Sequence, residues 1–292
     1  MTTTLKTLDT PVQRQIRQPG LSIIVPAYNE EMRLPRCLEH LAGYIAGLDR
    51  AIDVIVVENG STDGTANVVR SYQRTMPYLR LVQVAGRGKG WAVRAGMLAG
   101  TGDYLMFCDA DFSMPVNDID RFLAVLDDGA PIVIASRELP SSRRYDEPAR
   151  RHAMGRLYNR VVQALVIDGI DDTQCGFKAF QRPVARDLFG LQRTPGWAFD
   201  AEILYLARRR GYAVSQLPID WYYDGDSRVR QMSASLSMIG ETLRIRAYAA
   251  LHLYGRQRPC EGTLALSSTL APDAAMGNAN AGSAATVWGR TR

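Results

Sequence analysis

The stretch Tyr104-Leu105-Met106-Phe107-Cys108-Asp109-Ala110-Asp111 joins a strand-like apolar run to two acidic residues. Side chains on a strand alternate between faces, so residues two apart point the same way. We therefore expect Asp109 and Asp111 to converge where the strand ends. Two carboxylates beside open coordination positions suit a Mg²⁺ or Mn²⁺ ion that also holds substrate phosphates. The alternative is an ordinary polar strand end, because aspartate is common in turns.

Strand and helix patterns alternate from Leu21 to Ser136. Short apolar runs predict strands at 21–25, 52–57, 79–84, 103–108 and 132–135, and apolar residues at helical spacing predict helices at 30–45, 65–72, 91–99 and 119–126. Such repeats predict an α/β fold with a Rossmann-like, doubly wound, mainly parallel sheet and helices on both faces. Ligands of this fold class bind at the carboxyl ends of the strands.

The second half of the chain is less regular. We predict helices at 149–166, 199–210 and 235–254, a loop and strand within 171–180, and a strand at 213–217. Residues 1–19 are polar, and those from about 256 to 292 are rich in small residues with little apolar periodicity. We expect both terminal segments to be disordered.

Composition narrows the class of protein. The 292 residues are 46% hydrophobic with a formal charge of +5, a mild excess that fits nucleotide phosphates or lipid headgroups and diagnoses neither. The four cysteines form no CxxC pair and the three histidines lie far apart, which disfavours a zinc site. No apolar run reaches the ~20 residues of a spanning helix, and no signal peptide is evident. We expect a soluble or peripheral, cytoplasmic protein without a nucleic-acid partner.

A glycine-rich loop follows the third predicted strand. Gly86-Arg87-Gly88-Lys89-Gly90 does not match the Walker pattern, because no serine or threonine follows the lysine. Its backbone amides and Lys89 could still meet an anion at a helix N-terminus, and the alternative is a flexible turn. A nicotinamide-dependent oxidoreductase is disfavoured, since the first strand ends in Pro-Ala-Tyr-Asn-Glu and not in a glycine turn.

Four segments occur in a characteristic order: Ile24-Val25-Pro26-Ala27-Tyr28-Asn29-Glu30-Glu31, Val57-Glu58-Asn59-Gly60-Ser61-Thr62-Asp63-Gly64-Thr65, Gly88-Lys89-Gly90 and Asp109-Ala110-Asp111. Over roughly residues 20–250 the chain resembles the family 2 glycosyltransferases of the GT-A fold. It looks most like the dolichyl-phosphate (polyprenyl-phosphate) β-glucosyltransferases at 135–137, 172–178 and 197–202. The resemblance implies one domain at 20–255, with a nucleotide-sugar half at about 20–136 and an acceptor half at about 137–255.

The resemblance also implies roles for individual residues. Asp111 would hold the metal on the diphosphate with Asp109 nearby, and catalytic carboxylates are expected among Asp200, Asp172 and Asp109. Family members usually carry Asp-Asp where this chain has Glu58-Asn59. Glu58 could still accept hydrogen bonds from the ribose or base. The remaining substrate-binding residues would be Pro26, Ala27, Tyr28, Glu30, Lys89, Arg137, Lys178, Arg150 and Arg156.

The implied reaction is an inverting, metal-dependent transfer of glucose from UDP-glucose to dolichyl or polyprenyl phosphate. A phosphate acceptor is already largely anionic at neutral pH and needs cations more than a base, whereas a hydroxyl acceptor needs a carboxylate to take its proton. Candidate cations are Arg150, Arg151, Arg156, Lys178, Arg228 and Arg230. The alternatives are GDP-mannose or another nucleotide-sugar as donor, a hydroxyl acceptor, or a non-catalytic nucleotide-sugar-binding protein. The oligomeric state stays open.

The helix predicted at 235–254 bears on membrane contact. Its apolar residues recur at helical spacing, at Leu236, Ile239, Leu243, Ala247, Ala250, Leu251 and Tyr254. An amphipathic helix with arginines can lie in a bilayer interface, and the same pattern can close a protein core. Because a polyprenyl acceptor has to be met in a membrane, we favour peripheral membrane contact.

Overall fold

The computed structural model describes residues 20–223 and 231–255, without the side chains of 231–236. The predicted terminal disorder, the candidates Arg228 and Arg230, and the side chain of Leu236 lie outside this part of the chain. Within it, no helix is both long enough and apolar enough to cross a membrane.

A seven-stranded sheet forms the centre of the molecule, in the order β3-β2-β1-β4-β7-β5-β8. Its strands are β1 (Leu21–Ala27), β2 (Ile52–Glu58), β3 (Leu79–Gln83), β4 (Tyr104–Cys108), β5 (Ile132–Ser136), β7 (Phe177–Gln181) and β8 (Val214–Pro218). A separate two-stranded sheet pairs β6 (Arg143–Tyr145) with β9 (Asp220–Tyr222). The predicted α/β class and mainly parallel sheet are confirmed, and the predicted strands lie within about two residues of the observed ones.

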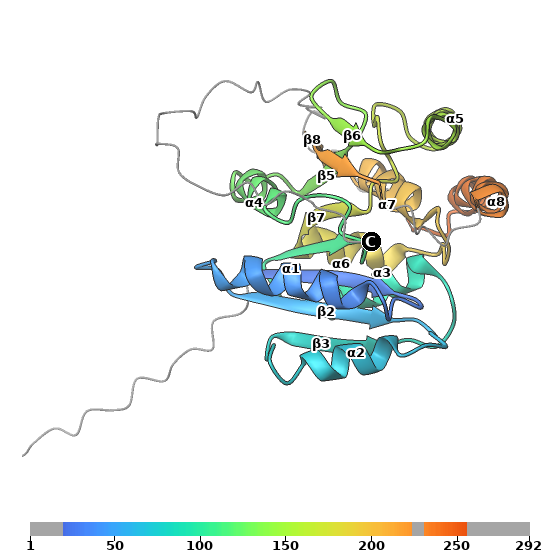
Figure 1. The fold of residues 1–292 in the computed structure, drawn as a ribbon. Helices are drawn as coiled ribbons and strands as arrows, with labels where there is room; N and C mark the ends of the chain where they lie inside the picture. The colour runs from blue at the N-terminus through green and yellow to red at the C-terminus, as the bar shows by residue number, and fades with distance from the viewer. Residues whose placement is uncertain (1–19, 224–230, 256–292) are drawn as a thin grey trace, which may run out of the picture.

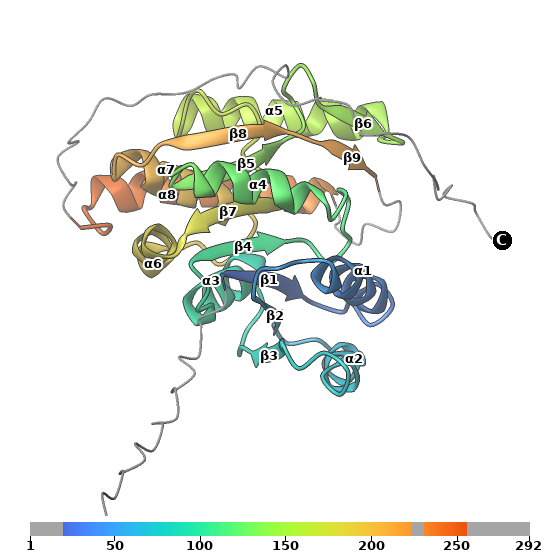
Figure 2. The ribbon, with the colours of Figure 1, turned by 90° about the vertical axis from the view of Figure 1, so that its left-hand side faces the viewer.

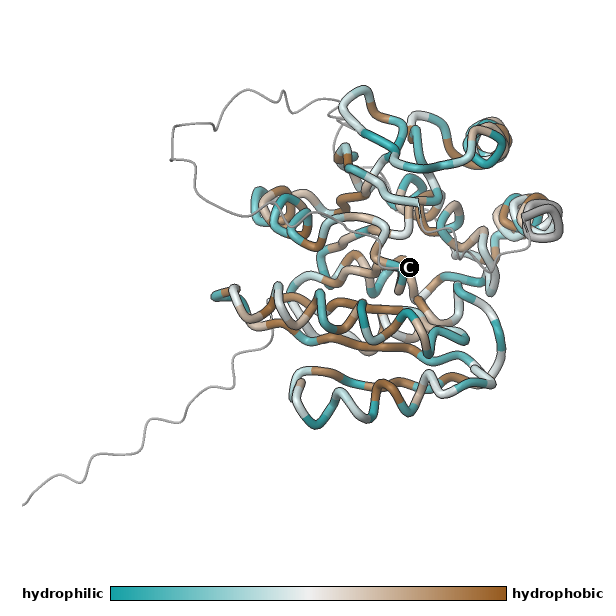
Figure 3. The backbone as a smooth tube through the Cα atoms, in the orientation of Figure 1, coloured by the Kyte–Doolittle hydropathy of each residue, from teal (hydrophilic) through white to brown (hydrophobic). Residues whose placement is uncertain are grey.

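Helices cover both faces of the sheet (Figures 1 and 2). They are α1 (Leu34–Ala46), α2 (Thr65–Tyr72), α3 (Lys89–Ala99), α4 (Asp118–Asp127), α5 (Ala149–Leu165), α6 (Arg182–Leu191), α7 (Phe199–Arg209) and α8 (Gln231–Ala250). Side chains of α1, α2 and α4 share one buried cluster with the sheet, and those of α3, α5, α6, α7 and α8 share the other. Apolar residues follow the strands between these two layers (Figure 3).

Strand β7 runs antiparallel to both of its neighbours, β4 and β5. Its direction was not predicted, because an apolar run specifies a strand and not its partners. The strand comes from the predicted acceptor half and β4 from the nucleotide-sugar half, so the two halves share one sheet. Lys178, in the middle of β7, lies opposite Phe107 of β4 and Ile134 of β5.

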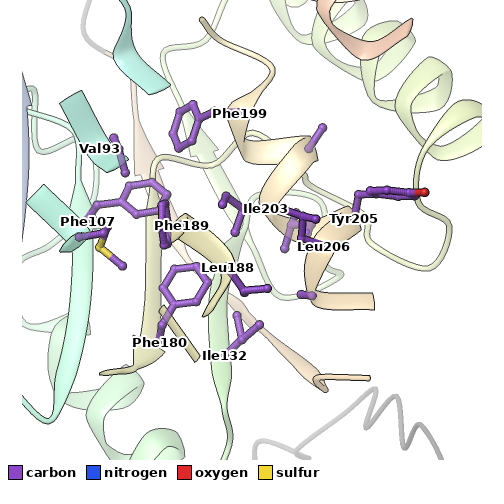
Figure 4. Packing of buried hydrophobic residues seen from close by; sticks show 14 of the residues in the cluster. Val93, Phe107, Ile132, Phe180, Leu188, Phe189, Phe199, Ile203, Tyr205 and Leu206 are labelled. Atoms are coloured by element: carbon purple, nitrogen blue, oxygen red, sulfur yellow. The ribbon is translucent and has the colours of Figure 1, made fainter. Parts of the chain in front are cut away.

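Helix α6 was missed in the sequence, yet it completes the core on one face. Its Phe189 packs edge-to-face on Phe107, with ring centroids 6.4 Å apart, and on Phe180, at 5.4 Å. Figure 4 shows these rings facing Leu188 and Ile203 between the sheet and α7. The rings fix α7 against the sheet, and α7 carries Asp200 at its N-terminal turn.

Glu202 of α7 fixes the loop that precedes this helix. The carboxylate is fully buried and accepts hydrogen bonds from the backbone N–H of Arg193, at 3.0 Å, and of Thr194, at 2.7 Å. It also accepts one from the Tyr254 hydroxyl, at 2.6 Å. The same loop meets the start of α3, where the Trp91 N–H donates to the carbonyl of Pro195. Glu202 therefore holds the loop against the glycine-rich segment before α3.

We predict that Glu202→Gln lowers the free energy of unfolding by about 2 kcal/mol or more. The amide would turn an N–H₂ group toward backbone donors and leave buried groups unsatisfied. Urea denaturation measures the change. Glu39→Gln is the matched control, since the exposed Glu39 only accepts a bond from Tyr72 and should cost under about 0.5 kcal/mol. Equal costs for the two variants would contradict this role.

Candidate active site

A pocket of about 250 Å³ lies at the carboxyl ends of β4 and β5. It brings together residues that are far apart in the sequence but were predicted as one site. These are Lys89, Asp109, Asp111, Arg137, Asp172 and Asp200. Helices α5 and α8 contribute further walls through Tyr158 and Met238.

Lys89 and the carboxylates after β4 form one corner of the pocket. The Lys89 ammonium lies 2.6 Å from Asp109 and 5.1 Å from the centroid of the Trp197 ring. Gly88 precedes this lysine with φ = +142°, and a Cβ on it would collide with the Pro195 backbone. The glycine thus lets the loop pass close enough to seat Lys89 at the end of the sheet.

Asp111 is the carboxylate of this corner that no cation pairs in the described part of the chain. Its carboxylate accepts the Ser113 N–H, at 3.3 Å. Burial and the neighbouring charge of Asp109 raise the pKa of Asp111 to about 6, although Lys89 opposes the shift. A cation placed beside Asp111 would offset the repulsion from Asp109 and stabilise the charged form of the carboxylate.

These carboxylates fit a Mg²⁺ or Mn²⁺ ion that shares its ligands with a substrate. The described residues contain no cluster of three or more acidic, histidine or cysteine side chains that would enclose a metal alone. Mg²⁺ is usually held by one or two carboxylates together with phosphate oxygens and water. Asp111 with Asp109 offers that donor set.

Asp200 lies in the pocket, held from below by Lys178. The Lys178 ammonium donates to the Asp200 carboxylate, at 2.6 Å, and to the Cys175 carbonyl, at 2.5 Å. Burial raises the pKa of Asp200, and the charges of Lys178 and Lys89 oppose the shift. The side chain of Lys178 is fully buried and does not line the pocket. Lys178 thus pairs with Asp200, and its contact with substrate stays a prediction.

The buried Asp172 and the partly buried Arg137 form a second ion pair. The guanidinium donates through two nitrogens, at 2.6 and 2.9 Å, and stacks over the Trp221 ring, at 5.4 Å. Burial favours the neutral acid, but Arg137 outweighs it and holds the pKa of Asp172 well below its usual range. A carboxylate with a lowered pKa is a poor proton acceptor, so this arrangement favours Asp200 over Asp172 as the reactive carboxylate.

The basic wall of the pocket differs in part from the predicted one. Arg150 and Arg156 are exposed on α5 and do not line the pocket, so their contact with substrate stays a prediction. Arg151 does line it. Its guanidinium stacks on the Tyr223 ring, at 4.8 Å, and its buried Nη1 has no hydrogen-bond partner among the residues that the structure describes. The Arg151 Nε lies 4.0 Å from the Glu147 carboxylate, so Arg151 is a partly paired cation whose Nη1 is left to receive an anion.

Two pocket residues, Arg144 and His152, were missed by the sequence argument. Arg144 is paired with Glu138, at 2.5 Å, and Glu147, at 2.6 Å, while His152 lies 3.3 Å from Glu138. Helical spacing could have distinguished the inward Arg151 from the outward arginines of α5, because Arg151 shares a face with the buried Tyr158. Arg144 has no such signal, since it lies on a three-residue strand.

Pro26, Ala27 and Tyr28 lie at the end of β1, which pairs with β2 so that Ala27 faces Glu58. They occupy the same edge of the sheet as the pocket without being among its lining residues. The Arg87 guanidinium covers the Tyr28 ring, at 5.3 Å. The nucleotide-binding role of these three residues therefore stays a prediction.

Glu30 and Glu58 both have partners inside the protein. Glu30 accepts two hydrogen bonds from Arg33, each at 2.7 Å. The Glu58 carboxylate accepts the Ser61 N–H and the Gln83 side-chain amide. Burial favours the neutral form of Glu58, yet these hydrogen bonds lower its pKa overall. Glu58 shapes the turn after β2, and its contact with a ribose or base stays a prediction.

Comparison with known proteins shows the family of this chain. Residues 22–189 match Glycosyl transferase family 2. A dolichyl-phosphate beta-glucosyltransferase of Dictyostelium discoideum is 35% identical over 77% of this chain and 73% of its own length. One of Drosophila melanogaster is 36% identical over 75% and 72%.

The fold matches solved structures as well. Glucosyl-3-phosphoglycerate synthase from Mycobacterium tuberculosis, solved with Mn²⁺ and UDP, superposes with a TM-score of 0.59 over 78% of this chain and 80% of that one, at 20% identity. The predicted GT-A fold is confirmed. The chain belongs to glycosyl transferase family 2, and the predicted enzyme class, a glycosyltransferase, is confirmed.

We predict that Asp172→Asn lowers the free energy of unfolding by about 3 kcal/mol at neutral pH, because the partly buried Arg137 would lose its countercharge. A lowered pKa means that the wild-type carboxylate stabilises the fold above the unfolded pKa of about 3.9, and that this contribution is lost as the pH falls toward the folded pKa. The difference in free energy of unfolding between wild type and variant should therefore become smaller in acid. Urea denaturation at several pH values measures it.

Asp127→Asn provides the matched control for this experiment. Asp127 pairs with Arg50, at 2.6 Å, but both side chains are substantially exposed. An exposed pair contributes about 0–1 kcal/mol. Equal effects of the two variants, or a gap that widens in acid, would contradict the structural role of Asp172.

Proposed function

We propose that this glycosyltransferase moves glucose from UDP-glucose to dolichyl or polyprenyl phosphate, with inversion at the anomeric carbon and with Mg²⁺ or Mn²⁺ as cofactor. One observation supports the proposal: a single pocket is lined both by the Asp109–Asp111 corner and by Arg151, whose Nη1 is left to receive an anion. The relatives named dolichyl-phosphate beta-glucosyltransferase support the choice of sugar and acceptor.

The donor diphosphate would bind at the corner that Lys89, Asp109 and Asp111 form. Asp111, with Asp109 beside it, would hold the metal, which acts as a Lewis acid that neutralises charge on the departing diphosphate. Lys89 is held by Asp109 at the start of α3 and adds a second positive charge at the same corner. These residues orient the donor so that the anomeric carbon faces the other side of the pocket.

The acceptor phosphate would bind on the α5 side of the pocket. Arginine suits phosphate because its guanidinium offers several donors in a fixed plane. Arg151 has a buried nitrogen available for this contact, and Arg137, which lines the same pocket, is held in place by Asp172. Because the phosphate arrives as an anion, binding by these cations can replace activation by a base.

Asp200 would lie between donor and acceptor. Lys178 fixes the orientation of its carboxylate from beneath the pocket and opposes its protonation. With a phosphate acceptor, Asp200 orients the substrates, and it can take a proton if the acceptor is monoprotonated. Since the acceptor's lipid chain lies in a bilayer, we place the protein at a membrane surface, on the cytoplasmic face.

We predict that Asp111→Ala lowers the rate of glucose transfer from UDP-glucose to short-chain polyprenyl phosphate by about 100-fold or more. The reason is the loss of a metal ligand, and metal stabilisation contributes several kcal/mol to such a transition state. Steady-state turnover at saturating Mg²⁺ or Mn²⁺ measures the effect. Asp128→Ala is the control. Asp128 is exposed and does not line the pocket, so this variant should keep wild-type turnover.

Two results would contradict the proposal. Turnover by the Asp111 variant above a tenth of wild type, with an unchanged melting temperature, would remove Asp111 from the metal site. Preferential transfer from GDP-mannose would replace UDP-glucose as the donor while leaving the enzyme class intact.

A further inference from the structure

Helix α8 has two apolar faces, of which only one belongs to the core. Met238, Ile245 and Ala249 are buried against the rest of the protein. Between them, the Thr242 hydroxyl shares a hydrogen bond with Tyr158 of α5, at 3.0 Å. This buried face accounts for the packing of the helix without using the apolar stripe identified in the sequence.

That stripe faces outward. Ile239, Leu243 and Leu251 are exposed by 36%, 53% and 67%, and Leu253 just after the helix by 40%. The small residues Ala247 and Ala250 are exposed with them, whereas Tyr254 is buried and belongs to the core. The structure thus answers the question left open by the sequence: the stripe does not close the core of the described chain.

Arginines border the exposed stripe. At 3.6 residues per turn, Arg246 lies along one edge of the stripe and Arg244 along the other. Both are exposed. An arginine beside a leucine stripe can place its stem on apolar surface and its guanidinium among polar headgroups. The exposed side of α8 therefore has the composition of a helix that lies in a membrane interface.

The neighbouring helix α5 extends this surface. Both helices stand at the same edge of the molecule, at the right of Figure 1. The outer side of α5 exposes Leu157, by 62%, together with Arg150, Arg156 and Arg160. Neither helix exposes an acidic residue, because α5 has none and Glu241 of α8 is buried and accepts the Ala198 N–H. The surface is uniformly basic.

This surface adjoins the active-site pocket. Residues on the inner sides of the same two helices line the pocket, namely Met154 and Tyr158 of α5 and Met238 of α8. A lipid whose phosphate reached Arg151 would therefore find apolar side chains on both helices along its way to the exterior.

We propose that the exposed sides of α5 and α8 dock on an anionic lipid bilayer. The leucines and isoleucine would enter the boundary of the acyl chains, and the arginines would meet lipid phosphates. We define the α5/α8 surface by Leu157, Ile239, Leu243, Leu251, Leu253, Arg150, Arg156, Arg160, Arg244 and Arg246. The inference rests on the proposed function only for the idea that the docked bilayer carries the acceptor.

Charge favours a bilayer over two other occupants. A second copy joined through the same surface would bring arginines against arginines. The segment 256–292 that follows in the sequence contains four arginines and two acidic residues, so it is itself basic. An anionic membrane is the complementary partner, with each exposed arginine strengthening the attraction.

Vesicle sedimentation tests the proposal with the full-length protein. Vesicles contain phosphatidylcholine alone, or equal parts of phosphatidylcholine and phosphatidylglycerol, and no acceptor lipid or donor is added. We expect binding to the anionic vesicles, weaker by tenfold or more for Leu243→Ser with Leu251→Ser. Arg244→Gln with Arg246→Gln should weaken binding on the order of tenfold, and only on anionic vesicles.

Controls separate docking from general effects of substitution. Arg70→Gln with Arg74→Gln removes two exposed arginines near α2, at the opposite end of the sheet, and Met32→Ser removes an exposed apolar residue. Both variants should bind vesicles like wild type, and melting temperatures verify that all variants are folded.

Three results would overturn the proposal. They are no binding of wild type to anionic vesicles, equal binding of the α5/α8 surface variants and the controls, or a wild-type dimer in sedimentation velocity that the leucine substitutions dissociate. Because no acceptor is present, failure of the proposed acceptor would leave vesicle binding unchanged, and failure of vesicle binding would leave transfer to a dispersed acceptor unchanged.

Discussion

The buried ion pair between Lys178 and Asp200 is the contact on which the site depends. It joins β7, in the middle of the sheet, to the first turn of α7. An unpaired charge at either position would be costly inside the protein. β7 therefore has to lie between β4 and β5, where Lys178 is below the pocket, and α7 has to bring Asp200 over it. The phenylalanines of β4, β7 and α6 hold these elements in that relation.

In the proposed reaction the pocket has two sides around this pair. Two carboxylates, one of them matched by Lys89, would form the donor side, and Arg151 with Arg137 would form the acceptor side, where carboxylates pair with the arginines. Asp172 serves the acceptor side by holding Arg137. A transfer between two phosphorylated substrates requires this separation, because both bring negative charge into one small volume. The arrangement fits a member of glycosyl transferase family 2 whose acceptor is an anion.

Patterns of local sequence predicted most of the sheet and the two carboxylates after β4, because burial and alternation are encoded in adjacent residues. They did not predict the direction of β7 or the pairing of Lys178, which was assigned to substrate. The direction of β7 depends on its pairing with the distant β4 and β5, and the pairing of Lys178 depends on Asp200, 22 residues further along the chain. Arg150 and Arg156 were assigned to the acceptor without applying the helical period of α5, which places Arg151 inward. Short β6, with Arg144, gave no periodic signal at all.

We propose that this pocket takes an acceptor that arrives as an anion. The most direct measurement compares the initial rates of glucose transfer from UDP-glucose to a short-chain polyprenyl phosphate and to the matching free alcohol, both dispersed in detergent with Mg²⁺ or Mn²⁺. We predict transfer to the phosphate at least about a hundred times faster, because the alcohol brings no charge for the arginines to position and its proton has to be removed, a step whose catalysis is typically worth ~10²–10⁴-fold. Transfer to the alcohol at an equal or higher rate would contradict it.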